Sequence, residues 1–184
     1  MSVTSAATQL LDPTAGPVEL TRQLCNIASV SGGERTIADA VEAMLIAHAP
    51  HLAITRDGDT VIARTELGRA RRVAIAGHLD TVPINDNLPV QDRVDPETGE
   101  PVIWGRGTVD MKAGVAVQLV LAVELVEPSV DLTWVWYDHE EVAAELSGLG
   151  RAMRHHPELF AADFAILGEP SNGTIEGGCN GTLR

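Results

Sequence analysis

Three short apolar runs of the sequence end directly in polar residues, and this arrangement restricts the fold more than any other feature. The runs are residues 72–76, 131–137 and 163–167, and segments with helical spacing separate them. Runs of this length and composition predict buried β-strands, and strands that alternate with helices predict an α/β domain. We therefore expect one domain with a central mixed, largely parallel sheet flanked by helices.

The remaining segments follow from turn and capping signals. Residues 1–16 are small and polar, so we expect a flexible N-terminal segment before an ordered part that starts at residue 17. Ser31 and Glu34 have the spacing of a capping box, which predicts the start of a helix there. The capped helix should end near residue 48. We also expect helices over residues 17–28, 111–126 and 147–156, and short strands over residues 52–56, 60–65 and 102–104.

The composition is typical of a globular protein with one core. The chain has 184 residues, of which 45% are hydrophobic and 21% charged. Its net charge of -13 argues against nucleic acid and anionic membranes as partners, because both require a basic surface. The first residues lack the features of a signal peptide. Cys25 and Cys179 could form one disulfide, but we expect two buried or free thiols and therefore a cytoplasmic location.

Histidine and acidic residues follow the predicted strands. A histidine two residues before an aspartate, as in His78 and Asp80, suggests a metal ligand and the group that orients it, although an isolated pair of this kind is more often an ordinary loop feature. Asp110 precedes a predicted helix, where it could simply be the N-cap. The acids at residues 138–141 could equally form a solvated turn.

Taken together, these residues predict a metal site. Parallel strands bring their carboxyl ends to one edge, so His78, Asp110, Glu141 and Glu169 should converge there. Carboxylates a few ångströms apart repel one another unless cations lie between them. Nitrogen and oxygen ligands without thiolates suit zinc, cobalt or manganese, and the number of acids favours two metal ions.

Four segments of the chain resemble one known family. The segments are GHLDTVP at residues 77–83, GRGTVDMKAG at 105–114, YDHEEV at 137–142 and LGEPS at 167–171. They resemble the signature segments of the zinc-dependent aminoacylase, carboxypeptidase and desuccinylase metallohydrolases, over residues 17–184. This resemblance implies a three-layer, di-zinc peptidase-like catalytic domain. Within the family, the stretch from residue 164 onward is most similar to actinobacterial succinyl-diaminopimelate desuccinylases.

The resemblance implies a role for each matching residue and a reaction. Two zinc ions are expected in each complete subunit, with cobalt as an alternative metal. The reaction implied is the removal of succinate from N-succinyl-LL-2,6-diaminopimelate, a small molecule, in lysine and diaminopimelate biosynthesis. The implied roles are His78 and Glu169 as ligands of the first metal, Asp110 as the bridge, Glu141 as a ligand of the second metal, Asp80 as the residue that orients His78, and Glu140 as the general base.

The sequence also departs from the family pattern. The family has a final metal-binding histidine and a smaller lid and dimerisation domain, and neither is found here, so we expect residues 17–184 to be the N-terminal part of a catalytic domain. The complete protein is expected to be a homodimer through that lid. Two alternatives remain open: an acetylornithine deacetylase or another N-acyl amino-acid hydrolase of the same family, and an inactive metal-binding fragment without the lid.

Overall fold

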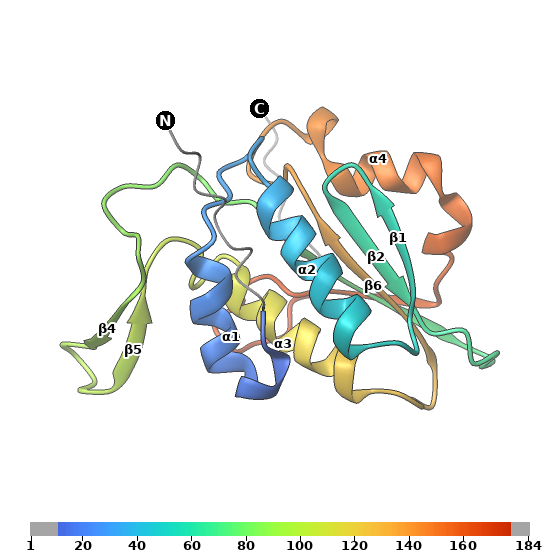
Figure 1. Ribbon diagram of the computed structural model, residues 1–184, viewed down its shortest axis with the longest axis horizontal. Helices are drawn as coiled ribbons and strands as arrows, with labels where there is room; N and C mark the ends of the chain where they lie inside the picture. Colours follow the sequence, from blue (N-terminus) through green and yellow to red (C-terminus); the bar gives the residue numbers. More distant parts are fainter. Residues whose placement is uncertain (1–10, 178–184) are drawn as a thin grey trace, which may run out of the picture.

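The computed structural model describes residues 11–177, which form one α/β domain (Figure 1). The strands of its main sheet are β1 (Ala53–Asp57), β2 (Thr60–Arg64), β3 (Arg72–His78), β6 (Asp131–Tyr137) and β7 (Phe164–Leu167), in the order β1-β2-β6-β3-β7. The helices are α1 (Gly16–Cys25), α2 (Arg35–His48), α3 (Lys112–Glu124) and α4 (Gly148–His155), with short 3-10 turns η1 (Pro13–Ala15), η2 (Ala144–Leu146) and η3 (Pro157–Phe160). A separate hairpin of β4 (Gln91–Val94) and β5 (Pro101–Trp104) projects from the body.

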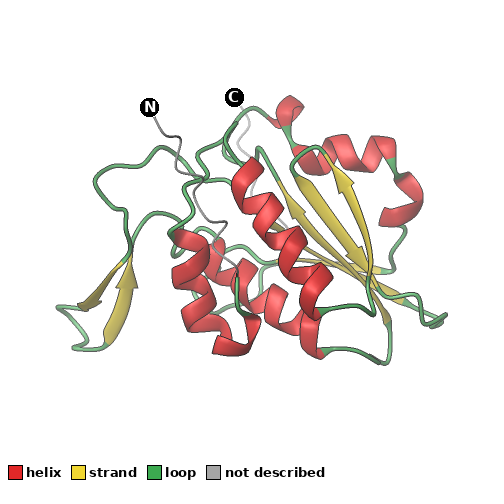
Figure 2. Ribbon diagram, viewed as in Figure 1, coloured by secondary structure: helices red, strands yellow, loops and turns green. Residues whose placement is uncertain are grey.

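Helices cover both faces of the sheet, and this gives three layers (Figure 2). Helices α1, α2 and α3 pack on one face, where Trp134 and Trp136 join the larger hydrophobic core. On the other face, Val135 and Tyr137 belong to a smaller core with Ala152 of α4. Alternate side chains of β6 therefore point to opposite layers, and the strand is buried on both faces. The predicted mixed, largely parallel sheet flanked by helices is confirmed.

The order of connections creates a crevice at one edge of the sheet. Strands β6, β3 and β7 are parallel, whereas β1 and β2 pair antiparallel to their neighbours. The chain leaves β3 through α3 on one face and leaves β6 through α4 on the other face. Adjacent strands whose connections run to opposite faces leave a gap beyond their carboxyl ends, which is where α/β proteins bind ligands. The ends of β3 and β6 are therefore the place to look for a site.

Some expectations differ from the structure. Strand β7 was expected to be buried, but its side chains are exposed, with Phe164 at 64% and Leu167 at 55%. Strand β4 is not among the strands expected from the sequence. Leu11 is buried, so within the described residues packed structure extends beyond the expected boundary at residue 17 toward the N-terminus. Apolar composition marks β7 as a strand, but only its neighbours determine whether it is covered.

Several remaining expectations concern residues that the structure describes only in part. Cys25 is a buried free thiol, whereas Cys179 and residues 1–10 of the expected flexible segment lie outside the described residues. Within residues 11–177, no helix combines the length and the apolar character that crossing a membrane requires.

Candidate metal centre

Four of the residues that the sequence singles out meet at the carboxyl edge of the sheet. His78, Asp110 and Glu141 each offer one ligand atom, and these three atoms lie within 4.8 Å of one another. The Nε2 atom of His78 is 3.0 Å from Oδ1 of Asp110 and 3.8 Å from Oε2 of Glu169. Bonds of about 2.0–2.2 Å to a divalent ion bring donor atoms to similar separations, so the arrangement suits a shared cation.

Each of these four residues comes from a different segment. His78 is the last residue of β3, Asp110 precedes α3, and Glu141 and Glu169 follow β6 and β7. Because β3, β6 and β7 are parallel, the segments that follow them start from the same edge. The structure thus brings together all four residues that we expect to bind metal, and their role as ligands stays a prediction.

Close packing of α3 against β3 places Asp110 beside His78. A Cβ atom on Gly77 would lie 2.7 Å from Cε of Met111 and 2.9 Å from Oε1 of Gln118, so no larger residue fits there without a shift. The Met111 sulfur also receives the backbone N–H of His78 at 3.2 Å. Glycine at this position therefore lets the start of α3 approach the end of the strand.

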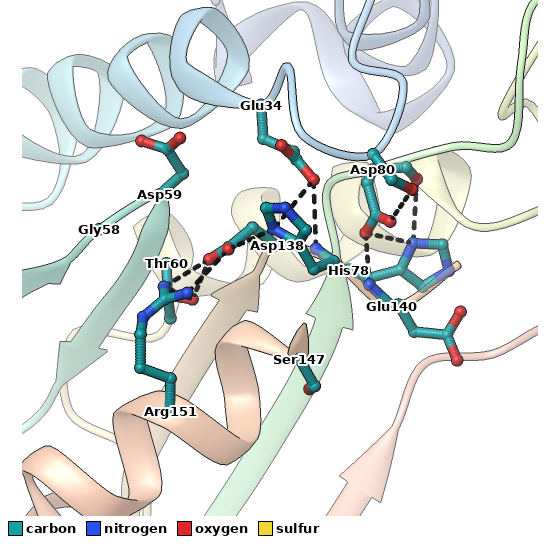
Figure 3. Close-up of polar contacts among 12 residues, drawn as sticks. Glu34, Gly58, Asp59, Thr60, His78, Asp80, Asp138, Glu140, Ser147 and Arg151 are labelled. Atoms are coloured by element: carbon teal, nitrogen blue, oxygen red, sulfur yellow. Dashed lines mark hydrogen bonds and ion pairs between the residues drawn. The ribbon is translucent and has the colours of Figure 1, made fainter. Parts of the chain in front are cut away.

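Asp80 connects His78 to the loop that carries the glutamate pair (Figure 3). The Nδ1 atom of His78 lies 3.0 Å from the backbone oxygen of Asp80 and 3.5 Å from its Oδ1 atom. The Asp80 carboxylate accepts the backbone N–H groups of Glu140 at 2.9 Å and Glu141 at 3.0 Å. Ser31 Oγ donates a further hydrogen bond to it at 2.6 Å. The backbone oxygen is therefore the nearer partner of the imidazole, while the carboxylate fixes the loop.

The cluster holds more negative than positive charge, and this shifts its pKa values. Burial opposes protonation of His78, but the hydrogen bond to Asp80 and the charge of Glu169 outweigh it and raise the pKa of His78 to about 9. Burial raises the pKa of Glu169 to about 7, against the opposing charge of His78 and with the support of Asp110. Burial and Asp110 also raise the pKa of Glu141. Such a cluster would gain from a divalent cation.

Glu140, the expected general base, lies at the same edge but is exposed. Its backbone is held by Asp80, whereas its carboxylate extends away from the Asp80 carboxylate in Figure 3. A cavity of about 290 Å³ opens beside the cluster and reaches Asp110 and Glu141. The other residues that line it are Thr81, Val82, Gly105, Arg106, Gly107, Thr108 and Val109. A small molecule in this cavity would therefore lie against Asp110 and Glu141, two of the four residues expected to bind metal.

Two residues that support the site have other contacts than the sequence predicts. Ser31 and Glu34 do not form the expected capping box, because α2 starts at Arg35 without a side-chain cap. Ser31 instead contacts Asp80, and Glu34 is fully buried and accepts the backbone N–H of His139 at 3.2 Å. A serine and a glutamate three positions apart are typical of a cap, so the sequence offered no local signal for these distant contacts.

Comparison with known proteins agrees with this geometry. The model of the family described as Peptidase family M20/M25/M40 matches residues 74–179. A Mycobacterium tuberculosis protein named as a succinyl-diaminopimelate desuccinylase is 50% identical over 175 residues, which cover 95% of this chain and 48% of that protein. The succinyl-diaminopimelate desuccinylase of Corynebacterium glutamicum is 47% identical over 178 residues, or 95% of this chain and 47% of that protein. The chain thus spans about half the length of these relatives.

Solved structures show the same fold. The M20 family metallo-carboxypeptidase Sso-CP2 from Sulfolobus solfataricus is similar over 82% of this chain and 36% of its own, with a TM-score of 0.64 and 16% identity. The Bacillus subtilis protein YXEP, described as a dinuclear metal binding peptidase of the M20 family, is similar over 84% of this chain and 42% of its own, with a TM-score of 0.55 and 18% identity. The resemblance found in the sequence is confirmed.

Proposed function

Because this chain belongs to peptidase family M20/M25/M40, we propose that it carries the metal-binding part of a metal-dependent amide hydrolase. The observation that carries the proposal is the meeting of ligand atoms from His78, Asp110 and Glu141 within 4.8 Å, from three separate segments at one edge of the sheet. Glu169 would complete the set, since its carboxylate lies 3.8 Å from His78. One imidazole and several carboxylates suit two zinc ions, with cobalt as an alternative.

The bound cations, Glu140 and Asp80 would each have a separate role in hydrolysis. Bound divalent cations would polarise the amide carbonyl and lower the pKa of the attacking water. Glu140, exposed and anchored through its backbone on Asp80, would take a proton from that water and return it to the leaving amine nitrogen. Asp80 would hold His78 and the Glu140 loop in one arrangement.

The substrate proposed is N-succinyl-LL-2,6-diaminopimelate, with succinate and LL-diaminopimelate as products. This choice is supported by the 50% and 47% identity to proteins named as desuccinylases of that compound, over 95% of this chain. A role in lysine and diaminopimelate biosynthesis, a cytoplasmic location and a homodimeric complete protein stay predictions.

Metal analysis of purified variants tests the proposed ligands. The wild-type chain should retain divalent metal after dialysis against zinc or cobalt, and His78→Ala and Glu169→Ala should each lose most of it. His155→Ala is the control, because its Nδ1 atom pairs with Asp57 at the end of β1 and not with the cluster. Unchanged metal content in both His78→Ala and Glu169→Ala would remove these residues from the site.

Activity assays test the substrate. The full-length gene product should release succinate from N-succinyl-LL-diaminopimelate much faster than it releases acetate from acetylornithine, and Glu140→Gln should lose this activity while it keeps its metal. Faster turnover of acetylornithine would instead assign the protein to another branch of the family.

A further inference from the structure

Glu34 is a buried carboxylate with few partners. Its side chain is fully buried, and its Oε2 atom is buried without a hydrogen-bond partner. Among residues 11–177 it forms no ion pair with lysine or arginine, and its only ionic neighbour is His139, whose Nδ1 atom is 3.5 Å from Oε1. A buried acid of this kind is costly, so its position calls for a physical reason.

The contact of Glu34 completes a set of backbone anchors on the loop after β6. Three successive N–H groups of this loop bind two buried carboxylates: His139 donates to Glu34, and Glu140 and Glu141 donate to Asp80. In Figure 3 the carboxylates of Glu34 and Asp80 both point toward this loop from the segments that bear them. Residues 139–142 belong to no helix, strand or hydrogen-bonded turn, so these hydrogen bonds fix the position of Glu140 and Glu141.

His139 needs such an anchor because its backbone is in the left-handed region, with φ of 59°. Non-glycine residues rarely adopt this conformation, and surrounding contacts must hold it. Two acids do so, because Asp138 Oδ2 lies 2.7 Å from the His139 ring at Nδ1 while Glu34 receives the backbone N–H. Asp138 is itself fixed by Arg151 and by Thr60. The left-handed backbone conformation of His139 is therefore held by Glu34 through the backbone N–H and by Asp138 through the ring.

The segment that presents Glu34 is fixed to the end of β3 as well. Ser31 donates its backbone N–H to the oxygen of Thr81 at 3.2 Å, and Thr81 donates to the oxygen of Ser29 at 2.9 Å. The Ser29 hydroxyl also donates to the oxygen of Leu79 at 2.7 Å. Residues 29–34 thus join the ends of β3 and β6, with Glu34 as their contact to the second of these ends.

We propose that Glu34 is a positioning residue that sets the loop of Glu140 and Glu141 relative to His78 by holding the backbone N–H of His139. This inference rests on the proposed function of the glutamate pair. The hydrogen bond and the ion pair of Glu34 within residues 11–177 both go to His139 and not to any of the four proposed ligands, so it would act only through the loop. Loss of its acceptor oxygen should move Glu141 out of reach of a shared cation and displace Glu140.

A pair of substitutions separates the acceptor from the shape of the side chain. Glu34→Gln keeps an oxygen that can accept the His139 N–H, whereas Glu34→Met has a similar length and no strong acceptor. With Co²⁺ as the probe, Glu34→Met should bind about 10- to 100-fold more weakly than wild type and show an altered visible spectrum, as substitutions behind metal ligands do. Glu34→Gln should bind Co²⁺ with an affinity within about threefold of wild type, which is a smaller change than the one expected when the acceptor oxygen is lost.

The control must report on stability alone. Ile37→Ala removes a fully buried side chain of the larger hydrophobic core from the first turn of α2, so it should lower the melting temperature and leave the Co²⁺ spectrum unchanged. In the full-length gene product, Glu34→Met should lower kcat more than it raises KM, because the loop carries the proposed base Glu140 and the proposed metal ligand Glu141.

The outcomes distinguish the two proposals. Wild-type protein that binds no Co²⁺ would overturn the proposed function, and this inference with it. Wild-type protein that binds Co²⁺ while Glu34→Met binds equally well with the same spectrum would overturn the positioning role alone. If Glu34→Met does not fold, hydrogen exchange decides: the His139 amide of the wild-type chain should be protected, and exchange at the rate of a solvent-exposed amide would refute the hydrogen bond to Glu34.

Discussion

Replacing Asp80 with asparagine should lower both the metal affinity and the free energy of unfolding, whereas the same change at Asp131 should lower only the free energy of unfolding. Both aspartates are buried, at 0% and 4% exposure. Asp131 Oδ1 accepts hydrogen bonds from the Thr65 hydroxyl and the Leu67 N–H, and its Oδ2 accepts the Arg69 N–H. The two residues lie at opposite ends of the sheet, since Asp131 starts β6 and Asp80 follows β3. Asp131 is therefore a matched control.

The magnitude follows from the hydrogen bonds of Asp80. Its Oδ2 atom accepts from the Ser31 hydroxyl and the Glu141 N–H, and its Oδ1 atom accepts from the Glu140 N–H. An asparagine oxygen can replace only one of these atoms, so the amide NH₂ group faces an N–H donor. Loss of one hydrogen bond to a charged group costs about 1.5–3 kcal/mol, and we expect roughly that loss of unfolding free energy in Asp80→Asn and in Asp131→Asn.

Metal affinity should separate the two variants. In the favoured orientation of the asparagine, the Glu140 N–H loses its acceptor and the loop shifts, which should weaken zinc binding about 10- to 100-fold, or about 1.4–2.7 kcal/mol. Asp131→Asn should bind zinc like the wild-type chain. Urea titration of the metal-free proteins and calorimetric titration with zinc measure the two quantities. Equal zinc affinity in both variants, whether retained or lost, would refute the reasoning.

Three further outcomes are expected. The pKa values of His78 and Glu169 are raised to about 9 and about 7, so protons compete with metal for these two groups. Zinc affinity measured by titration should therefore fall as the pH decreases from 9 to 6. A zinc affinity that does not change with pH would contradict the charge analysis. The pKa of Asp80 is lowered from 3.8 to about 2, so this group contributes roughly 2 kcal/mol to the free energy of unfolding above about pH 4. The contribution is lost as the pH falls toward 2. Acid unfolding of metal-free Asp80→Asn should lack this pH-dependent component. Arg151→Met leaves Asp57 and Asp138 without their shared partner and should lower the free energy of unfolding by about 3 kcal/mol in urea, and no change would show that this buried network does not stabilise the fold.

The sequence predicts most of the sheet and the location of the site, for local reasons. The strands that become β1, β2, β3 and β6 were each expected within one or two residues, because apolar runs and turn residues mark them independently of their partners. In α2, the apolar side chains at helical spacing are all buried, namely Ile37, Val41, Met44 and Leu45. Strand polarity then requires that residues after parallel strands meet at one edge, so convergence follows without knowledge of the exact strand order.

The contacts that support the site could not be predicted, because they join distant segments. Ser31 and Glu34 match a capping box within a window of four residues, yet their partners are 49 and 105 residues away. The local pattern gives no means of choosing between a nearby backbone donor and a remote one. Exposure of β7 escaped prediction for a related reason, because an apolar strand has the same composition whether or not another element covers it.

The direction of the pKa shifts separates two kinds of acid at this edge. Burial would raise the pKa of Asp80, but the hydrogen bonds from His78, Ser31 and the Glu140 and Glu141 backbone lower it to about 2, so the fold itself stabilises this negative charge. Glu141 and Glu169 have few such donors, and burial with neighbouring acids raises their pKa values.

Acids that the fold satisfies have no need of an external ion, whereas acids with a raised pKa gain the most from one. By position alone, Asp80, Glu141 and Glu169 are all acids that follow a strand. The structure divides them into supports, with Asp80 as the example, and candidates for ligands, with Glu141 and Glu169 as the examples. The division also explains why substitution of Asp80 should weaken metal binding without removal of a ligand: its carboxylate uses its hydrogen-bonding capacity on the loop that presents Glu141.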